Sequence, residues 1–227
     1  MRRDELLEML AEGAPRVTAL IGGGGKTTLL FALGDFMARR GKRVVLTTTT
    51  HLGYAAQAVS PASPAELNGA IRPGKALLAA YPDGARHKMT GIPLEWYSAL
   101  QVDHILVEAD GSRCRPLKVH RAFEPVLPPD TGLLVQVAGL SALGRPAGEA
   151  VHCYDIVGLS PEAPVDEETV AALLERGFGK AGFSGPKLAL LNQADTPELV
   201  RRGENIAAAL AQRGFPAALT CLKGRKD

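Results

Sequence analysis

The fold of this chain is decided by one stretch near its start, Val17-Thr18-Ala19-Leu20-Ile21-Gly22-Gly23-Gly24-Gly25-Lys26-Thr27-Thr28. A short apolar run leads into four glycines, and an apolar-periodic segment begins at Leu29, so the expected order is strand, loop, helix. Glycines allow positive φ angles and a close approach of the backbone, so their N–H groups can converge on phosphate oxygens at the positive end of the following helix. The stretch therefore predicts a phosphate-binding loop at Gly22, Gly23, Gly24 and Gly25.

The residues after the glycines predict the chemistry of this loop. Lys26 is placed to reach the terminal phosphates of a bound nucleotide, Thr27 offers a hydroxyl to Mg²⁺, and Thr28 continues the phosphate-binding turn. The pattern departs from G-x-x-x-x-G-K-[ST] at its first position, where Leu20 stands instead of a small residue. The alternative is a flexible glycine-rich turn between two ordinary elements.

Length and composition indicate one globular domain. The 227 residues suffice for one α/β domain with a substantial core, and 46% hydrophobic with 22% charged residues argues against disorder. We expect a single P-loop nucleotide-binding domain over residues 1–227, with a variable substrate or partner insertion at about residues 52–100.

Composition also bears on compartment and partners. No apolar run approaches the roughly 20 residues of a membrane span, and the first five residues lack the apolar core of a signal peptide, so we expect a cytoplasmic protein without a membrane partner. A net charge of +2 is too small to indicate a nucleic-acid partner. The odd number and wide spacing of Cys114, Cys153 and Cys221 indicate reduced thiols rather than disulfides or a zinc ribbon.

A second strand is expected at residues 44–46, and it continues into four threonines, residues 47–50, followed by His51. Ligands of open α/β sheets bind at the carboxyl ends of the strands, so Thr48 and Thr49 are candidates for contact with a terminal phosphate or another anion. The alternative is that these threonines simply suit a strand and that alternate ones face water.

A third strand is expected from residue 104, and it ends in two carboxylates, Glu108 and Asp110. This pattern is typical of a strand whose acid holds Mg²⁺ directly or through water. Side chains of an extended chain alternate, so both carboxylates point the same way, and either could bind the metal while the other orients water. We therefore take Lys26, Glu108 and Asp110 as candidate catalytic residues. The alternative is a strand that ends in a polar turn.

Basic residues follow directly, and Arg113, Arg115 and Lys118 are the candidates for binding phosphate or an anionic substrate. The alternative is that these residues simply form a solvent-exposed charged face.

A further strand at residues 187–191 ends in Asn192-Gln193-Ala194-Asp195. This resembles the N-K-x-D element of GTP-binding proteins, with Gln193 in place of the lysine. It predicts base recognition by Asn192 and Asp195 and leaves guanine and adenine both open, whereas a plain turn before a helix is the alternative.

The remaining periodicities place helices on both sides of these strands. Helices are expected at residues 4–12, from 29 to about 40, at 64–70, from 92, after an N-cap at Asp166, and after an N-cap at Thr196, with strands at 76–80, 132–138 and 215–222. The predicted fold class is α/β: a three-layer P-loop NTPase-like fold with a mostly parallel twisted sheet flanked by helices.

Taken in order, these motifs resemble the YqeC family of selenium-dependent hydroxylase accessory proteins, within the P-loop NTPase superfamily. The resemblance covers nearly the whole chain, and its specific parts are Glu-Ala-Asp-Gly-Ser at 108–112 and Asn-Gln-Ala-Asp at 192–195, with Pro-Leu-Lys at 116–118 and Glu-Pro at 124–125. It implies a cytoplasmic protein that acts in the maturation of molybdenum hydroxylases, with such a hydroxylase or its maturation proteins as partners.

Three functions stay open at this point. The first is an accessory factor that hydrolyses GTP or ATP with Mg²⁺, and the second is a small-molecule phosphotransferase whose basic loop holds the acceptor. The third is a module that binds nucleotide or a molybdenum cofactor without turnover. Histidines and cysteines lack metal-binding spacing, so such a metal site is expected only at the interface of a homodimer, an oligomeric state that the sequence leaves open.

Overall fold

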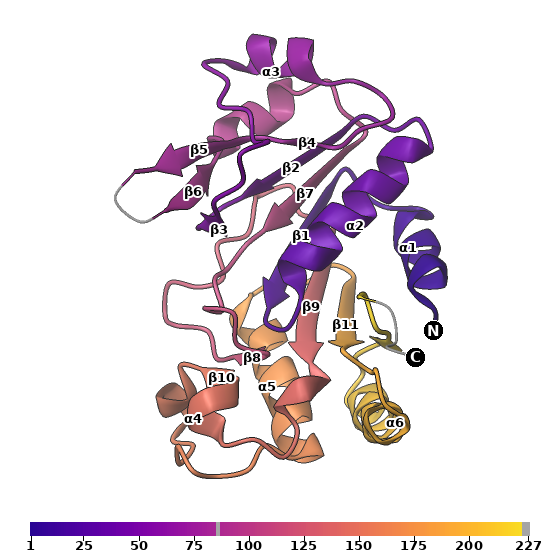
Figure 1. The fold of residues 1–227 in the computed structure, drawn as a ribbon, viewed down its shortest axis with the longest axis vertical. Helices are drawn as coiled ribbons and strands as arrows, with labels where there is room; N and C mark the ends of the chain where they lie inside the picture. The colour runs from indigo at the N-terminus through magenta and orange to yellow at the C-terminus, as the bar shows by residue number, and fades with distance from the viewer. Residues whose placement is uncertain (85–86, 224–227) are drawn as a thin grey trace.

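A computed structural model of the chain describes residues 1–84 and 87–223. Within these residues a seven-stranded sheet runs through the molecule in the order β12-β11-β9-β1-β7-β2-β4, and its strand pairs are parallel (Figure 1). The strands are β1 (Val17–Gly22), β2 (Val44–Thr48), β4 (Leu77–Leu78), β7 (His104–Glu108), β9 (Leu133–Gly139), β11 (Lys187–Asn192) and β12 (Ala217–Leu219). The predicted α/β class with a parallel sheet is confirmed.

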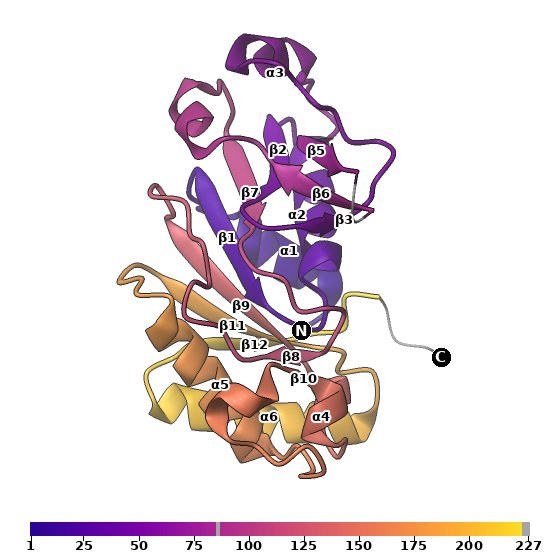
Figure 2. The same cartoon turned by 90° about the vertical axis from the view of Figure 1, so that its left-hand side faces the viewer.

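Helices cover both faces of the sheet and make three layers. The helices α1 (Arg3–Ala11) and α2 (Lys26–Arg39) lie on one face, where they bury Leu20, Leu106 and Val135 from alternate strand positions. The other face is covered by α5 (Glu167–Lys180) and α6 (Pro197–Gln212) at one end (Figure 2). Its other end is covered by α3 (Pro64–Ala70) and the 3₁₀ helix Leu94–Ala99. Burial on both faces explains why these strands are continuously apolar.

Two helix starts follow the capping residues that the sequence predicted. The Asp166 side chain accepts a hydrogen bond from the Thr169 amide at the start of α5. The Thr196 hydroxyl accepts one from the Leu199 amide at the start of α6, whose first residue is proline. Both caps satisfy an amide that has no intrahelical acceptor, which fixes the start of each helix.

The region between β2 and β7 differs most from the predicted elements. The strand predicted at residues 76–80 is divided between β4, which joins the central sheet, and β5 (Ala80–Asp83). β5 pairs with β6 (Lys88–Gly91), which pairs with β3 (Leu52–Gly53), in a separate antiparallel sheet. The helix predicted from residue 92 is a 3₁₀ helix, and the strand predicted at 215–222 is limited to three residues. Pairing with distant strands sets these boundaries, and a local pattern does not contain that information.

Short elements complete the chain between β7 and α5. β8 (Leu117–Lys118) pairs in parallel with β10 (Val151–His152), next to α4 (Ala147–Ala150) and the 3₁₀ helices Leu140–Ala142 and Tyr154–Val157. Among the described helices, none has the length and apolar character needed to cross a membrane.

Candidate functional site

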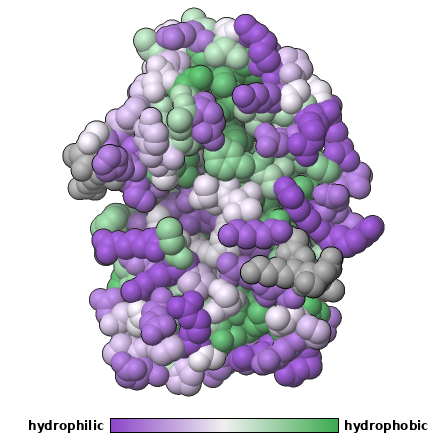
Figure 3. All heavy atoms as spheres, in the orientation of Figure 1, coloured by the Kyte–Doolittle hydropathy of each residue, from purple (hydrophilic) through white to green (hydrophobic). Residues whose placement is uncertain are grey.

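The carboxyl ends of four sheet strands lie along one edge of the sheet, beside a cavity. Gly22 ends β1, Glu108 ends β7, Thr48 ends β2 and Asn192 ends β11, and the parallel order of the sheet brings these ends to one edge. The cavity beside them has a volume of about 730 Å³. Figure 3 shows polar residues across the middle of the molecular face that it draws. The cavity lining is Gly24, Gly25, Lys26, Thr27, Thr28, His51, Gly53, Lys88, Glu108, Gly111, Ser112, Arg113, Cys114, Ser141, Asn192, Gln193, Asp195, Cys221 and Lys223.

The glycine loop leads directly into the first turn of α2 at this cavity. The N-cap of α2 is Gly25, with φ 134°, so no side chain caps the first amide groups of the helix. A Cβ atom on Gly25 would overlap Nδ2 of Asn192, so glycine is required here by close packing as well as by the backbone angle. The uncapped amides and the helix dipole make this end of α2 a site for an anion, as a phosphate-binding loop needs.

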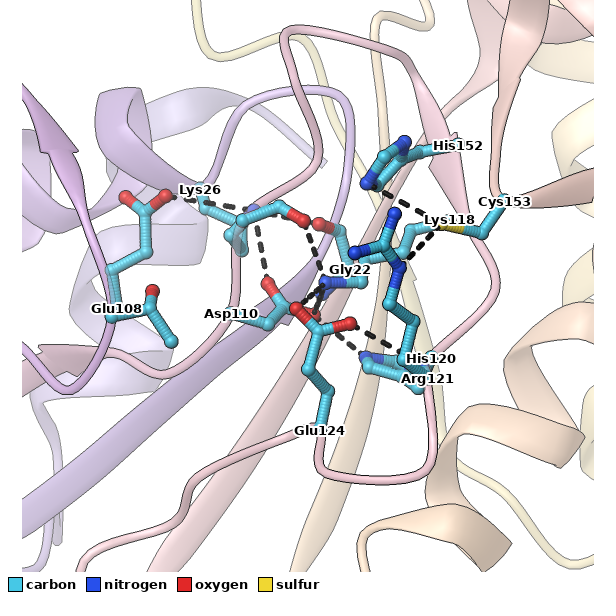
Figure 4. A network of polar contacts seen from close by, with 12 residues as sticks. Gly22, Lys26, Glu108, Asp110, Lys118, His120, Arg121, Glu124, His152 and Cys153 are labelled. Carbon is cyan, nitrogen blue, oxygen red and sulfur yellow. Dashed lines mark hydrogen bonds and ion pairs between the residues drawn. The ribbon is translucent and has the colours of Figure 1, made fainter. Parts of the chain in front are cut away.

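Lys26 is buried below the loop and is paired with two carboxylates. Its Nζ donates to the Gly22 carbonyl at 2.6 Å and lies 3.1 Å from Asp110 Oδ1 and 3.5 Å from Glu108 Oε1 (Figure 4). Burial opposes the charge on the ammonium, but the two carboxylates outweigh it, so the pKa of Lys26 is raised. Lys26 is therefore a fixed cation at the cavity wall.

Thr27 and Glu108 place two oxygen ligands side by side. The Thr27 hydroxyl donates to Glu108 Oε2 at 2.8 Å, and both residues line the cavity. Burial raises the pKa of Glu108, and the nearby Lys26 ammonium and Thr27 hydroxyl only partly offset this effect. A hydroxyl and a carboxylate of this kind fit Mg²⁺, which usually takes one or two carboxylates together with substrate phosphates. Such a site needs no larger cluster, and among the described residues no group of three or more His, Cys, Asp or Glu is arranged around a metal position.

Asp110 has a different environment from Glu108. It has no exposed surface and is not part of the cavity lining. Its Oδ2 accepts from the Gly22 amide at 2.8 Å and lies 2.6 Å from His120 Nε2 (Figure 4). Burial alone would raise its pKa, but Lys26, the hydrogen bond from His120 and Lys118 hold the pKa of Asp110 well below its usual range. The geometry thus favours Glu108 over Asp110 as metal ligand, and makes Asp110 an ionised anchor under the glycine loop.

The segment after Asp110 supplies further buried partners. Lys118 Nζ donates to the Gly111 carbonyl at 2.6 Å, and it lies 2.8 Å from Glu124 Oε1 and 3.7 Å from Asp110 Oδ2. Sequence reasoning placed His120 only in the basic run after Asp110, and it predicted no contact of His120 or Glu124 with Asp110 or Lys118. The two-residue spacing of Lys118 and His120 could have indicated these contacts, because side chains two residues apart on an extended segment point to the same side of the chain.

The other anion candidates are engaged differently. The Thr48 hydroxyl donates to the Glu108 carbonyl at 2.7 Å, and the Thr49 hydroxyl donates to the Val126 carbonyl at 2.6 Å. Arg115 donates to the Val151 carbonyl at 2.7 Å. Together with the buried Lys118, these side chains lie outside the cavity lining, whereas Arg113 is part of it.

The predicted base-recognition element closes the β11 end of the cavity. Asn192 Nδ2 donates to the Gly24 carbonyl at 2.8 Å, and Asn192 Oδ1 accepts from the Leu222 amide at 3.0 Å. Asn192 therefore ties β11 to the glycine loop, while the exposed Asp195 lines the cavity beside it. Gln193 has a φ of 67°, and its Oε1 accepts from the Ser141 hydroxyl at 2.6 Å.

Fold and site together define a three-layer α/β protein with a P-loop-like arrangement, in which a glycine loop, a lysine, a threonine and an acid share one cavity. The YqeC protein family model matches residues 18–155. The chain is also 33% identical over 187 residues to a protein of Escherichia coli (strain K12) described as "Uncharacterized protein YqeC", with 77% of this chain and 73% of that protein covered. The chain belongs to the YqeC family.

Proposed function

We propose that this protein binds a nucleoside triphosphate with Mg²⁺ and hydrolyses it. The observation that carries the proposal is the hydrogen-bonded pair of Thr27 and Glu108, next to Lys26, at the wall of the cavity that the glycine loop opens into. These are the groups that phosphate and metal binding need, since catalysis of phosphoryl transfer is mainly positioning and charge stabilisation.

Each of these residues then has a defined task. The amides of the first α2 turn and the Lys26 ammonium hold phosphate oxygens and stabilise charge on the transferring group. The Thr27 hydroxyl and the Glu108 carboxylate hold Mg²⁺, which would neutralise charge on the phosphate oxygens when bound. Asp110 keeps Lys26 and the Gly22 amide in position. For base recognition, Asn192 orients the loop and the exposed Asp195 carboxylate contacts the base, and guanine and adenine both stay candidates.

The cellular role that we propose is that of a cytoplasmic accessory factor in the maturation of selenium-dependent molybdenum hydroxylases. Its support is the family resemblance, and its expected partners are the hydroxylase or the proteins that mature it. Hydrolysis would change the contacts of the glycine loop, and the segment that holds Asp110, Lys118 and His120 could carry that change to a partner surface.

The test compares Thr27→Val with Thr27→Ser in the full chain. Valine keeps the branched shape but removes the hydroxyl, whereas serine keeps the hydroxyl, so the pair isolates one metal ligand. Substitution of Lys26 would be less clear, because it leaves two buried carboxylates without their cation. Binding of fluorescent GTP and ATP analogues is titrated with and without Mg²⁺, and phosphate release is followed with the natural nucleotides.

We expect Mg²⁺ to tighten nucleotide binding to the wild-type protein and to Thr27→Ser. In Thr27→Val this tightening falls by about tenfold or more, which corresponds to about 1.4 kcal/mol for the lost ligand, and turnover is lost. A wild-type protein that binds neither nucleotide at millimolar concentration refutes the proposal. Tight binding without phosphate release, also in the presence of a candidate hydroxylase, favours the non-hydrolysing module instead.

A phosphotransferase is the second candidate function, and one observation favours it. Arg113 lines the same cavity as Thr27 and Glu108, so a cation from the basic loop is available to a phosphate acceptor. Formation of a phosphorylated product from an added small molecule, in place of free phosphate, would distinguish it from hydrolysis.

A further inference from the structure

The cavity continues past the glycine loop on the side away from Asn192. Its wall there includes His51, Gly53 and Lys88 from the region after β2, and residues 111–114 after β7 line the same cavity next to the glycine loop. Neither His51 nor Lys88 belongs to the glycine loop or to the base-recognition element. This end of the cavity therefore has residues that the proposed nucleotide contacts leave unused.

Close packing fixes the small antiparallel sheet over this end of the cavity. Leu52 pairs with Met89, and a Cβ atom on Gly91 would overlap the Thr48 carbonyl oxygen. The Ile92 amide donates to the Thr47 hydroxyl at 3.2 Å. The sheet is thus bound to the end of β2, and it holds Lys88 at a defined place beside the phosphate loop.

The cavity lining includes the exposed cations Lys88 and Arg113. Neither side chain has an ion pair or hydrogen bond with any residue that the structure describes. His51 Nε2 lies 3.5 Å from Asp83 Oδ2. The carboxylate at this end that lines the cavity, Glu108, is already engaged by Lys26 and Thr27.

The backbone next to Arg113 is unusual for its residue types. Arg113 and Cys114 have φ angles of 51° and 62°, so two consecutive non-glycine residues lie in the left-handed region. Such conformations are unfavourable and concentrate at binding and catalytic sites, where the surrounding structure maintains them. Here they bring both residues to the cavity wall.

The sheet order gives the direction of a bound nucleotide. The predicted base contacts lie at the end of β11, on one side of β1, whereas β7 and β2 follow on the other side. A triphosphate held by the loop after β1, with its base at β11, has its terminal phosphate toward β7 and β2. That phosphate therefore points to the end of the cavity where Lys88 and His51 lie, with Arg113 in the lining of the same cavity.

We propose that this end of the cavity binds a second ligand, a small anionic molecule that carries a phosphate or carboxylate group, beside the terminal phosphate of the nucleotide. Lys88 and Arg113 are its binding cations: both line the cavity, and they come from different segments of its wall. The inference rests on the proposed nucleotide binding, and it gives the region after β2 a role as the second wall of a two-ligand site.

The test first measures binding of a non-hydrolysable GTP or ATP analogue with Mg²⁺, and then titrates the loaded full chain with inorganic phosphate or succinate by calorimetry. The variant is the double substitution Lys88→Gln and Arg113→Gln. The matched control is Lys180→Gln with Arg176→Gln, which removes the same charge from exposed positions on α5. Phosphate and succinate distinguish a phosphorylated ligand from a carboxylate ligand.

We expect at least one of the two anions to bind the loaded wild-type protein and to bind at least about tenfold more weakly to the Lys88 and Arg113 variant. The control variant keeps the wild-type anion affinity, and all three proteins keep their affinity for the analogue. If the analogue binds but neither anion does, or if both variants lose anion affinity equally, the second site is refuted and nucleotide binding stands. If the analogue itself does not bind, the proposed function and this inference both fail.

Discussion

The two carboxylates beside Lys26 are expected to differ strongly in what their neutralisation costs, and Asp110→Asn against Glu108→Gln tests this in the absence of Mg²⁺ and nucleotide. Asp110 is fully buried, and its ionised form is stabilised by Gly22, His120 and Lys26, at 2.8, 2.6 and 3.1 Å. Breaking a buried ion pair costs about 3–5 kcal/mol. Asparagine keeps the shape and one acceptor oxygen, so we expect Asp110→Asn to lower the free energy of unfolding by about 2–4 kcal/mol at pH 7.

Glu108 has the reverse balance. Burial raises its pKa despite the contacts with Lys26 and Thr27, so its ionised form is on balance disfavoured in the folded protein. Glutamine removes that cost along with the contacts, and we expect the free energy of unfolding to change by no more than about 1 kcal/mol. The same substitution should abolish tightening of nucleotide binding by Mg²⁺.

The pH dependence has a definite sign for each group. The pKa of Asp110 is lowered, so its contribution to stability is present above the unfolded value of about 3.9 and is lost as pH falls toward the folded value. The pKa of Glu108 is raised, so its contribution is present below about 4.3 and is lost as pH rises through the folded value. Asp110→Asn should flatten the acid side of the stability profile, and Glu108→Gln should remove the loss at higher pH.

Urea unfolding at pH 7, followed by far-UV circular dichroism and by the fluorescence of Trp96, the single tryptophan, measures both variants. A loss of about 3 kcal/mol corresponds to a Tm lower by about 6–12 °C for a domain of this size. Unchanged m-values would confirm that both variants unfold from the same compact state. Equal destabilisation by the two substitutions would refute the distinction between a structural Asp110 and Glu108 as the proposed metal ligand.

Three further predictions concern the surroundings of the site. Asn192→Ala should lower the free energy of unfolding by about 1–3 kcal/mol, because it leaves the Gly24 carbonyl without its donor. It should also weaken nucleotide binding in a fluorescence titration, and unchanged affinity would contradict the role of Asn192 in holding the loop. Burial, followed by nearby cations, lowers the pKa of His152 to about 4, so its contribution to stability is present above about 6.5 and is lost as pH falls toward 4. The Tm of His152→Asn, measured by thermal unfolding, should therefore fall less steeply with pH over that interval than the Tm of the wild type. Glu167 accepts from Arg202 at 2.8 and 2.9 Å, and this hydrogen bonding lowers the pKa of Glu167 to about 2. Because solvent screens the pair, Glu167→Gln should lower the free energy of unfolding at pH 7 by at most about 1 kcal/mol, as measured by urea unfolding. A cost well above that would refute the screening argument.

The sequence predicted the elements whose signal is local. The apolar run before the glycines, the lysine after them and the caps at Asp166 and Thr196 each depend on neighbours within a few residues, and the structure has strands and helices at those places. Parallel strand order then brings Glu108 and Asn192 to the loop without further information.

The different surroundings of Glu108 and Asp110 needed the structure. Alternation along an extended chain put both carboxylates on one side, but β7 ends at Glu108, so that alternation no longer applies at Asp110. The side chain of Asp110 lies instead among donors from β1 and from the segment at Lys118 and His120. The contribution of Lys88 to the cavity was equally hidden, since it depends on how a separate small sheet packs on β2.

The departure at Leu20 has a physical explanation in the length of β1. Leu20 is a buried strand residue that packs among the side chains of α2, and its carbonyl accepts from the Ala109 amide at 2.8 Å. The chain leaves the strand only at Gly22, whose φ is 95° and where a Cβ atom would overlap the Val137 carbonyl oxygen. The need for a small residue has thus moved from position 20 to position 22. Because the Gly22 amide donates to Asp110 and the Gly22 carbonyl accepts from Lys26, the loop is anchored at this glycine, and Leu20 serves the core without disturbing the proposed phosphate loop.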